Sequence, residues 1–364
     1  MRGRSFWYNY KIIVLSLNLA YIRIVSESIP TIKEIAKRLN VSVSTVSRAL
    51  SDHPRISAKT KEAVKELAKA LNYEPNSKAI FFKQKKSYVI GVIVPHIYED
   101  FFSKGISGIE DTALENGYTI LFGQSHDRIE KERQVVDAMK NQRVDGLIIS
   151  LSKETNKSDH LKTLDAYNIP VVYFDRVPSL ANVNKVYCNL FEGTVDMIEW
   201  LFKQDRKRIA FINGPNAIIA SKERLDGYIE GISRRKLKVD MQMVEQTDFS
   251  EEGTHKAVAR LLGLKKPPDA IISFNDYVHM DAVKYALKEH VKINEDILFA
   301  SYANISVNKH TAYPPVVSID QFPYSQGEAA MKMLMDILQN KSDEDTATKA
   351  FQHKEIPVAL VYNS

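Results

Sequence analysis

The chain has 364 residues, of which 44% are hydrophobic, so it is long enough for two or three globular domains with sizeable cores. Residues 1–87 hold 17 Lys and Arg against 6 Asp and Glu, whereas residues 88–364 hold 33 against 39. This asymmetry favours a polyanion-binding N-terminal region, with a solvated lysine-rich surface as the alternative. The single cysteine, Cys188, excludes an internal disulfide and a cysteine-based zinc site and indicates a reducing cytoplasm.

Residues 1–28 form a segment whose role the sequence leaves open. Arg2, Arg4 and Lys11 precede an apolar run over residues 12–22, an order that resembles the core of a signal peptide. The run is too short to span a bilayer comfortably, so no stable membrane association is expected. An extension without a functional role is favoured, and a membrane-associating arm and a true export signal are the alternatives.

Three short helices are predicted within residues 29–75. The first two follow hydroxyl side chains suited to the N-cap position, Thr31 and Ser42, and the third begins at Ser57. The helices are expected over residues 32–40, 43–50 and 57–72, each with apolar residues on one side. Two short helices joined by a tight turn and braced by a third predict a helix-turn-helix, and a generic three-helix bundle is the alternative.

The run TIKEIAKRLNVSVSTVSRALS, residues 31–51, resembles the signature of the lactose/galactose repressor family. The segments ISAKT, residues 56–60, and LNYEPN, residues 71–76, stand where that family has its third helix and the lead into its hinge. The resemblance implies a cytoplasmic transcription factor that binds a pseudo-palindromic DNA operator as a homodimer.

The resemblance also implies roles for individual side chains on DNA. Val43 and Ser44 are expected to face base edges in the major groove. Arg48 is expected to contact a base or a phosphate, because a guanidinium pairs bidentately with guanine. The residues expected to position the DNA backbone are Thr31, Ser42, Thr45, Ser47, His53, Lys59, Tyr73 and Asn76.

Residues 76–87 resemble the hinge helix and linker of the family, where the helix folds when two subunits meet on the minor groove. Ala79 matches the family pattern. Phe82 stands where the family places a leucine that wedges into a base step and bends the duplex. Phenylalanine also wedges, so the same mechanism is expected, and packing of Phe81 and Phe82 against the larger domain is the alternative.

Residues 88–364 alternate short apolar runs with helical patterns. Strands are predicted over residues 88–94, 118–122, 146–150, 171–174, 208–212, 270–273, 297–300 and 316–319. Helices are predicted over residues 101–115, 129–141, 160–167, 193–203, 221–236, 251–262 and 278–288. This alternation predicts an α/β fold with parallel sheets, and its two series predict two Rossmann-like lobes with a cleft between them.

This region resembles the periplasmic sugar-binding proteins, which is the fold that the repressor family carries. The resemblance implies three crossings of the chain between lobes, which are expected near residues 188–190, 318–322 and 348–351. The first lobe then takes residues 88–188 and 322–348, and the second lobe takes the rest. Residues 88–364 are therefore expected to bind an effector and to dimerise.

Candidate effector-binding residues follow the predicted strands, where ligands of such sheets bind. Asp175 and Arg176 together can grip vicinal hydroxyls, and a surface ion pair is the alternative. The resemblance adds aromatic, guanidinium and amide groups, which are Phe101, Phe102, Arg224, Phe249 and Gln321. The alternatives are core packing for the phenylalanines and an ordinary helix-face charge for Arg224. Asn275 is a further candidate, although its position favours a helix N-cap.

One departure from the family concerns the effector. After the predicted strand at residues 297–300 the family has Gly-aromatic-Asp, whose Asp binds ligand hydroxyls. This chain has Ser301-Tyr302-Ala303-Asn304, so the acid is missing and Asn304 is a candidate replacement. A sugar or sugar derivative is the expected effector, with a purine-like or other polar metabolite as the alternative.

The sequence contains no catalytic motif, phosphate-binding loop or histidine spacing typical of a metal site. We therefore expect no enzyme activity, no cofactor and no metal. The predicted function is a sequence-specific, DNA-binding transcriptional regulator controlled by a small polar effector. An exported ligand-binding protein and an enzyme on the same two-lobed fold are the alternatives.

Overall fold

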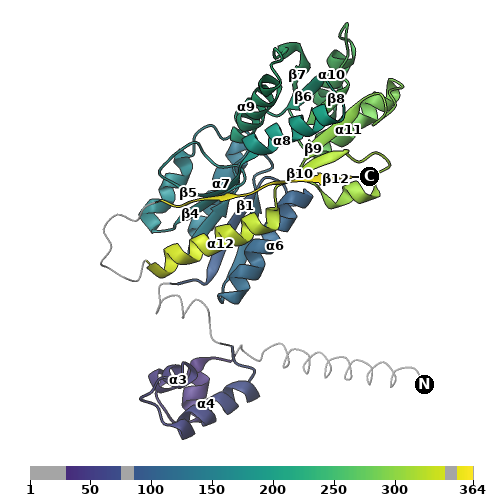
Figure 1. The fold of residues 1–364 in the computed structure, drawn as a ribbon. Helices are drawn as coiled ribbons and strands as arrows, with labels where there is room; N and C mark the ends of the chain where they lie inside the picture. Colours follow the sequence, from purple (N-terminus) through teal and green to yellow (C-terminus); the bar gives the residue numbers. More distant parts are fainter. Residues whose placement is uncertain (1–29, 75–85, 341–350, 364) are drawn as a thin grey trace, which may run out of the picture. The chain divides into compact units, whose positions relative to one another are not determined.

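The computed structural model describes residues 30–74, 86–340 and 351–363. The chain divides between Ser87 and Tyr88 into two compact units, which we call the head and the body (Figure 1). The predicted extension over residues 1–28 and the predicted hinge residues Asn76, Ala79 and Phe82 lie outside the described residues.

Residues 30–74 of the head form three helices, as predicted. They are α2 (Ile32–Arg38), α3 (Val43–Leu50) and α4 (Ala58–Ala70). The two expected N-caps are confirmed, and Ser57 caps α4 in the same way: the hydroxyls of Thr31, Ser42 and Ser57 accept hydrogen bonds from backbone amides three residues later at 3.3, 3.1 and 3.2 Å. Each cap satisfies a donor that the first helical turn leaves free.

A small core joins the three helices of the head. Ile35 of α2, Val46 of α3 and Val64 of α4 are fully buried in it. Since these residues occupy only one side of each helix, the opposite side of α3 is left at the surface.

The body contains two six-stranded sheets, one in each lobe. In spatial order the sheet of the first lobe consists of β11 (His353–Ile356), β5 (Asn184–Cys188), β4 (Val171–Phe174), β3 (Gly146–Ile149), β1 (Val89–Val94) and β2 (Thr119–Gln124). All its neighbouring strands are parallel. Its helices are α6 (Asp100–Glu115), α7 (Ile129–Gln142), the 3₁₀ helix η1 (Asp159–Tyr167) and α12 (Pro323–Asn340).

The sheet of the second lobe repeats this order. It consists of β12 (Ala359–Tyr362), β10 (Val317–Asp320), β9 (Leu298–Tyr302), β8 (Ala270–Ser273), β6 (Ile209–Asn213) and β7 (Val244–Gln246), with β12 antiparallel to β10. Its helices are α8 (Leu190–Lys203), α9 (Ile219–Arg234), α10 (Glu251–Leu262) and α11 (Asp276–Lys288), with short 3₁₀ helices η2 (Met241–Met243) and η3 (Ser306–His310). The predicted parallel α/β architecture with two lobes is confirmed.

The third crossing between lobes corrects a prediction. The chain crosses after β5 and after β10, near the expected residues 188–190 and 318–322. It crosses again between β11 and β12, at residues 357–358, and not near residues 348–351. The expected crossing was misplaced because β11 is polar and mostly exposed, so nothing in its sequence marks an edge strand of the first lobe.

Helices cover both faces of each sheet. Alternate residues of the first sheet pack against α6 and α12 on one face, and against α7 and η1 on the other. In Figure 1, α6 and α12 lie side by side. Their approach requires glycine, because a Cβ atom at Gly108 would lie 2.2 Å from the Tyr324 carbonyl oxygen, and one at Gly327 would lie 2.0 Å from the Gly105 carbonyl oxygen.

Several elements were not among those predicted. They are the strands β5, β7, β11 and β12 and the helix α12. Strands β5, β7 and β11 are short and rich in polar residues, so they lack the apolar run that marks the central strands, whereas β12 is a short apolar run that was not recognised as a strand. The segment expected as a helix over residues 160–167 is the 3₁₀ helix η1.

Candidate functional site

The outer face of α3 is the candidate DNA-binding surface. Val43 is 41% exposed, and Ser44 and Arg48 are exposed beside it, while Ser47 is half-buried. No other described residue forms an ion pair with the Arg48 guanidinium, so it is available to a ligand. The Ser42 hydroxyl lies 2.7 Å from that of Ser44, which gathers hydroxyl groups at the N-terminus of α3.

The other predicted DNA-binding residues of the head have different surroundings. The Thr45 hydroxyl lies 2.8 Å from that of Ser42, and Thr31 caps α2. His53 accepts a hydrogen bond from the Arg55 amide, and Lys59 is exposed on α4. Tyr73 packs against the head core, and burial raises the pKa of its hydroxyl.

A pocket lies in the cleft between the two lobes of the body. Residues of both lobes line it, and they include seven of the eight predicted effector-binding residues: Phe101, Phe102, Asp175, Arg176, Arg224, Asn275 and Gln321. The eighth, Phe249, does not line it but packs against Phe274, which does, with ring centroids 4.8 Å apart. The structure therefore brings together side chains that are more than 200 residues apart in sequence.

The cavity of this pocket is small. Its volume is about 50 Å³, whereas pockets that hold small ligands measure about 300–1,000 Å³. Asp100 connects the first lobe to the second lobe beside this pocket. Its carboxylate accepts a hydrogen bond from the Ser306 amide at 3.0 Å, and its amide donates to the Tyr277 hydroxyl at 3.2 Å.

Arg224 is buried, which rules out the alternative of an ordinary helix-face charge. It is 4% exposed and donates hydrogen bonds to the Phe274 carbonyl oxygen at 2.7 Å and to the Gln321 side chain at 3.3 Å. Its guanidinium also lies between the rings of Phe274 and Tyr302, at 4.0 and 4.2 Å from their centroids. Its Nε atom is buried without a hydrogen-bond partner among the described residues.

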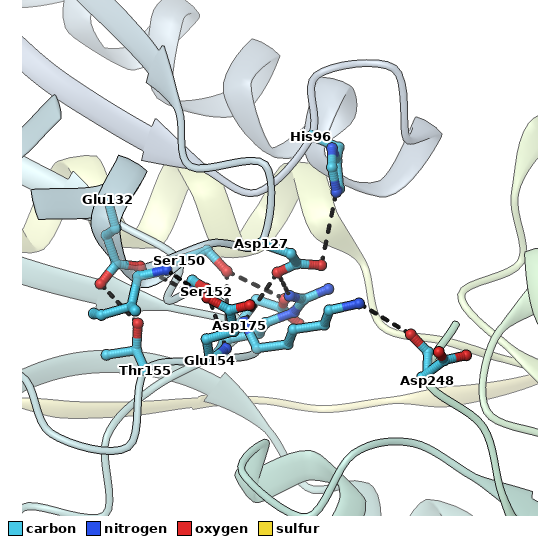
Figure 2. Close-up of polar contacts among 12 residues, drawn as sticks. His96, Asp127, Glu132, Ser150, Ser152, Glu154, Thr155, Asp175 and Asp248 are labelled. Atoms are coloured by element: carbon cyan, nitrogen blue, oxygen red, sulfur yellow. Dashed lines mark hydrogen bonds and ion pairs between the residues drawn. The ribbon is translucent and has the colours of Figure 1, made fainter. Parts of the chain in front are cut away.

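Asp175 and Arg176 do not form the ion pair that the sequence offered as an alternative. Arg176 pairs instead with Asp127, a buried carboxylate that follows β2. Asp127 also lies 3.7 Å from His96 and accepts a hydrogen bond from the Lys153 amide at 2.9 Å (Figure 2). It therefore joins three loops at the cleft, and the sequence analysis missed it.

A second buried carboxylate, Glu132 of α7, holds the loop that follows β3. Figure 2 shows its contacts with Ser152 and Thr155. It accepts hydrogen bonds from the Ser152 amide at 2.6 Å and from the Thr155 hydroxyl at 2.9 Å, and it lies 2.9 Å from His160. In the same loop, the Lys153 ammonium reaches the second lobe and donates to the Asp248 carbonyl oxygen at 2.9 Å. Glu132 thus fixes a loop that contacts both lobes.

Glu99 is a pocket residue that the sequence analysis also missed. It lines the cavity beside Asp175 and Arg176, immediately before α6. Burial raises the pKa of its carboxyl to about 7; Arg176 lowers this pKa, whereas Asp127 and Asp175 raise it. Its position next to the predicted Phe101 and Phe102 was the one signal in the sequence that pointed to it.

The position of the missing family acid is resolved by the structure. Ala303 lines the pocket, whereas Asn304 does not; its amide nitrogen donates to the Asp320 carboxylate at 2.9 Å. Asn304 is therefore directed to Asp320 and not to this cavity. Asn275 caps α11 as predicted, because its side chain accepts from the Val278 amide at 2.9 Å.

Two families match the chain. Residues 31–76 match "Bacterial regulatory proteins, lacI family", and residues 90–342 match "Periplasmic binding protein domain". Among curated proteins, the HTH-type transcriptional repressor CytR of Escherichia coli (strain K12) is 31% identical over 86% of this chain and 92% of its own length.

Solved structures share the fold. A lac repressor dimer bound to operator and the anti-inducer ONPF has a TM-score of 0.78 at 23% identity, covering 92% of this chain and 98% of that one. A complex of the transcriptional regulator CelR with cellobiose has a TM-score of 0.68 at 24% identity, covering 91% and 98%.

The match to the head disfavours the alternative of an exported ligand-binding protein, and the similar curated protein is a transcriptional repressor. No helix in residues 30–74, 86–340 and 351–363 is long and apolar enough to cross a membrane. The helix-turn-helix head, the two-lobed body and these similarities together show that the chain belongs to the lacI family of bacterial transcriptional regulators.

Proposed function

We propose that this protein binds a pseudo-palindromic operator as a homodimer and that a small polar effector, a sugar or sugar derivative, controls this binding from the cleft. The observation that carries the proposal is the joint presence of an unpaired, exposed α3 surface and a closed polar cleft. The similar lac repressor structure is a dimer on operator, and the similar CelR structure holds cellobiose.

The α3 surface supports major-groove recognition. Val43 offers an apolar contact, Ser44 a hydroxyl and Arg48 a forked donor, and all three are exposed on one side of the helix. The N-terminal amides and hydroxyls of α3 add phosphate contacts that fix the register. The remaining predicted contacts, Thr31, Ser42, Thr45, Ser47, His53, Lys59 and Tyr73, would orient the head on the backbone.

The cleft supports effector control. Contacts between the lobes through Asp100 and Lys153 flank the pocket, so an effector that enters must break and remake them. An effector that changes the separation of the lobes also changes the position of the first lobe, whose β1 begins directly after the linker from the head. Coupling between two such sites amounts to about 1–3 kcal/mol.

The test of DNA binding is recovery of genomic fragments by the purified full-length protein at about physiological salt, followed by sequencing. We expect a few fragments that share a pseudo-palindrome. Recovery of unrelated fragments with a steep dependence on salt would show non-specific binding only and would contradict the proposal.

The test of the cleft uses Arg224→Ala. This variant removes the guanidinium that holds Gln321 and Phe274 at the pocket, so the operator complex should no longer respond to the effector. The matched control is Arg234→Ala, which changes an exposed arginine of the same helix. An unaltered response in Arg224→Ala would show that the effector binds elsewhere.

A further inference from the structure

The two arginines that line the cleft pocket, and Lys153 of the loop after β3, donate hydrogen bonds to the protein itself. Arg176 donates to Asp127, and Arg224 donates to the Phe274 carbonyl oxygen and to Gln321. Lys153 donates to the Asp248 carbonyl oxygen across the cleft. None of these hydrogen bonds reaches the two carboxylates that line the pocket, Glu99 and Asp175.

Those two carboxylates lack strong partners. The Glu99 side chain makes no hydrogen bond or ion pair with any residue in the described part of the chain. Asp175 has a single long contact with the Ser150 hydroxyl, at 3.4 Å. Burial raises the pKa of both carboxyls, whereas the nearby Arg176 lowers both. Each side chain is half-buried, and a carboxylate that is partly withdrawn from water is stabilised by a donor, above all a cationic one.

The rest of the wall also suits a cation. Aromatic rings line the pocket on the sides of both lobes, and they belong to Phe101, Phe102, Phe274 and Tyr277. The face of an aromatic ring attracts a cation within about 6 Å, and exclusion of water strengthens both this attraction and that of a carboxylate. Protein cations already contact two of these rings, since the Arg224 guanidinium lies over Phe274 and the Arg176 guanidinium over Phe102, which leaves Phe101 and Tyr277 for a ligand.

We propose that the effector carries a protonated amine, which lies against Glu99 and Asp175 within this ring of aromatic side chains. The proposal deepens the effector control proposed above and rests on it. The amine donates to both carboxylates and supplies the hydrogen bonds that Arg176, Arg224 and Lys153 direct to other acceptors. The buried, unpaired Nε atom of Arg224 then takes an acceptor of the same ligand, such as a hydroxyl oxygen. An amino sugar has both groups.

The test compares matched ligands in which an amine replaces one hydroxyl. Thermal shift and calorimetric titration of the full-length protein are carried out with D-glucosamine and D-glucose, D-galactosamine and D-galactose, and D-mannosamine and D-mannose. Serinol and glycerol extend the comparison beyond sugars. We expect at least one aminated ligand to bind at least tenfold more tightly than its hydroxyl partner.

The variant Glu99→Gln keeps the size of the side chain and removes its charge, so it should reduce this preference to less than threefold. The control Glu110→Gln, which changes an exposed residue of the same helix α6, should retain it. Melting of both variants without ligand establishes that they are folded.

Tighter binding of the hydroxyl partner, an amine preference that survives Glu99→Gln, or no binding by any aminated ligand would each overturn the proposal. Binding of a neutral sugar would still leave effector control by the cleft intact, and operator binding is measured separately by recovery of genomic fragments. The failure of this inference is therefore distinguishable from the failure of the proposed function.

Discussion

The α3 surface of the head and the cleft of the body are built in opposite ways. Val43, Ser44 and Arg48 belong to one helix of eight residues, and all are exposed. The cleft collects its side chains from loops of two lobes and withdraws their charges from water, as Arg224 and Asp127 show. A surface of the first kind can change one side chain at a time, whereas each change in the second removes a partner from a buried neighbour.

The largest effect is expected where the cleft network is most buried. Glu132→Ala deprives the Ser152 amide, the Thr155 hydroxyl and His160 of their shared acceptor. Loss of one partner from such a buried polar network costs about 3–5 kcal/mol of unfolding free energy. Denaturant unfolding of the full-length protein measures this loss. The control Glu130→Ala changes an exposed residue of the same helix and should cost under about 0.5 kcal/mol. Equal losses would show that Glu132 is not the residue that fixes the loop.

The second effect is a pH dependence that only the cleft should show. Burial raises the pKa of Glu99 from 4.5 to about 7, so the folded state binds this proton more tightly than the unfolded state. The stability that protonated Glu99 contributes is present below about pH 4.5 and is lost as the pH rises through about 7.

The unfolding free energy of Glu99→Gln relative to that of the wild type should therefore rise by on the order of 3 kcal/mol as the pH increases from 5 to 8. Glu223 and Asp276 also have raised pKa values, of about 7 and about 6, but they are common to both proteins and cancel in the difference. Unfolding curves of the variant and the wild type at pH 5 and pH 8 measure the difference in their unfolding free energies. A difference that does not change with pH would mean that Glu99 titrates as an exposed carboxyl does.

On the α3 surface we expect a smaller effect that leaves the fold unchanged. Arg48→Ala should cost about 1–3 kcal/mol of operator binding if the guanidinium reads a base. Because the side chain is exposed and pairs with no other described residue, the melting temperature of the head should stay the same. Binding to the operator and to non-specific DNA, measured at one salt concentration, separates base reading from a phosphate contact. A uniform loss on both DNAs would contradict the base-reading role.

The smallest effect concerns the start of α3. Ser42→Ala removes the hydroxyl that accepts from the Thr45 amide and should cost about 1 kcal/mol of stability. Ser42→Asp is the matched control, because its carboxylate also caps a helix and should restore most of the loss. Thermal unfolding of both variants measures the loss. A melting temperature of Ser42→Ala equal to that of the wild type would mean that the cap does not stabilise the head.

The head could be predicted almost completely from the sequence because its interactions are local. The three caps join residues three positions apart, and the apolar residues of each helix recur at helical spacing. The central strands of the body, such as β4 and β8, were predicted at their observed bounds for a similar reason, because they are short, continuous apolar runs.

The edge strands and the partners in the cleft could not be predicted in this way. Polar β11 becomes a strand only because β5 lies beside it, and their residues are more than 160 positions apart. Likewise, Arg176 follows Asp175 in sequence but pairs with Asp127, which a different strand places opposite it.

The sequence by itself determined the helices of the head, the family resemblance and half of the residues that line the cleft, because each depends on local spacing or on a motif. Only the tertiary structure decided which charges meet there. It joined Arg176 to Asp127 and Arg224 to Gln321, and it left Glu99 and Asp175 without strong partners. The physical reason is that burial strengthens or penalises a charge according to its neighbours, and chain folding alone brings those neighbours together.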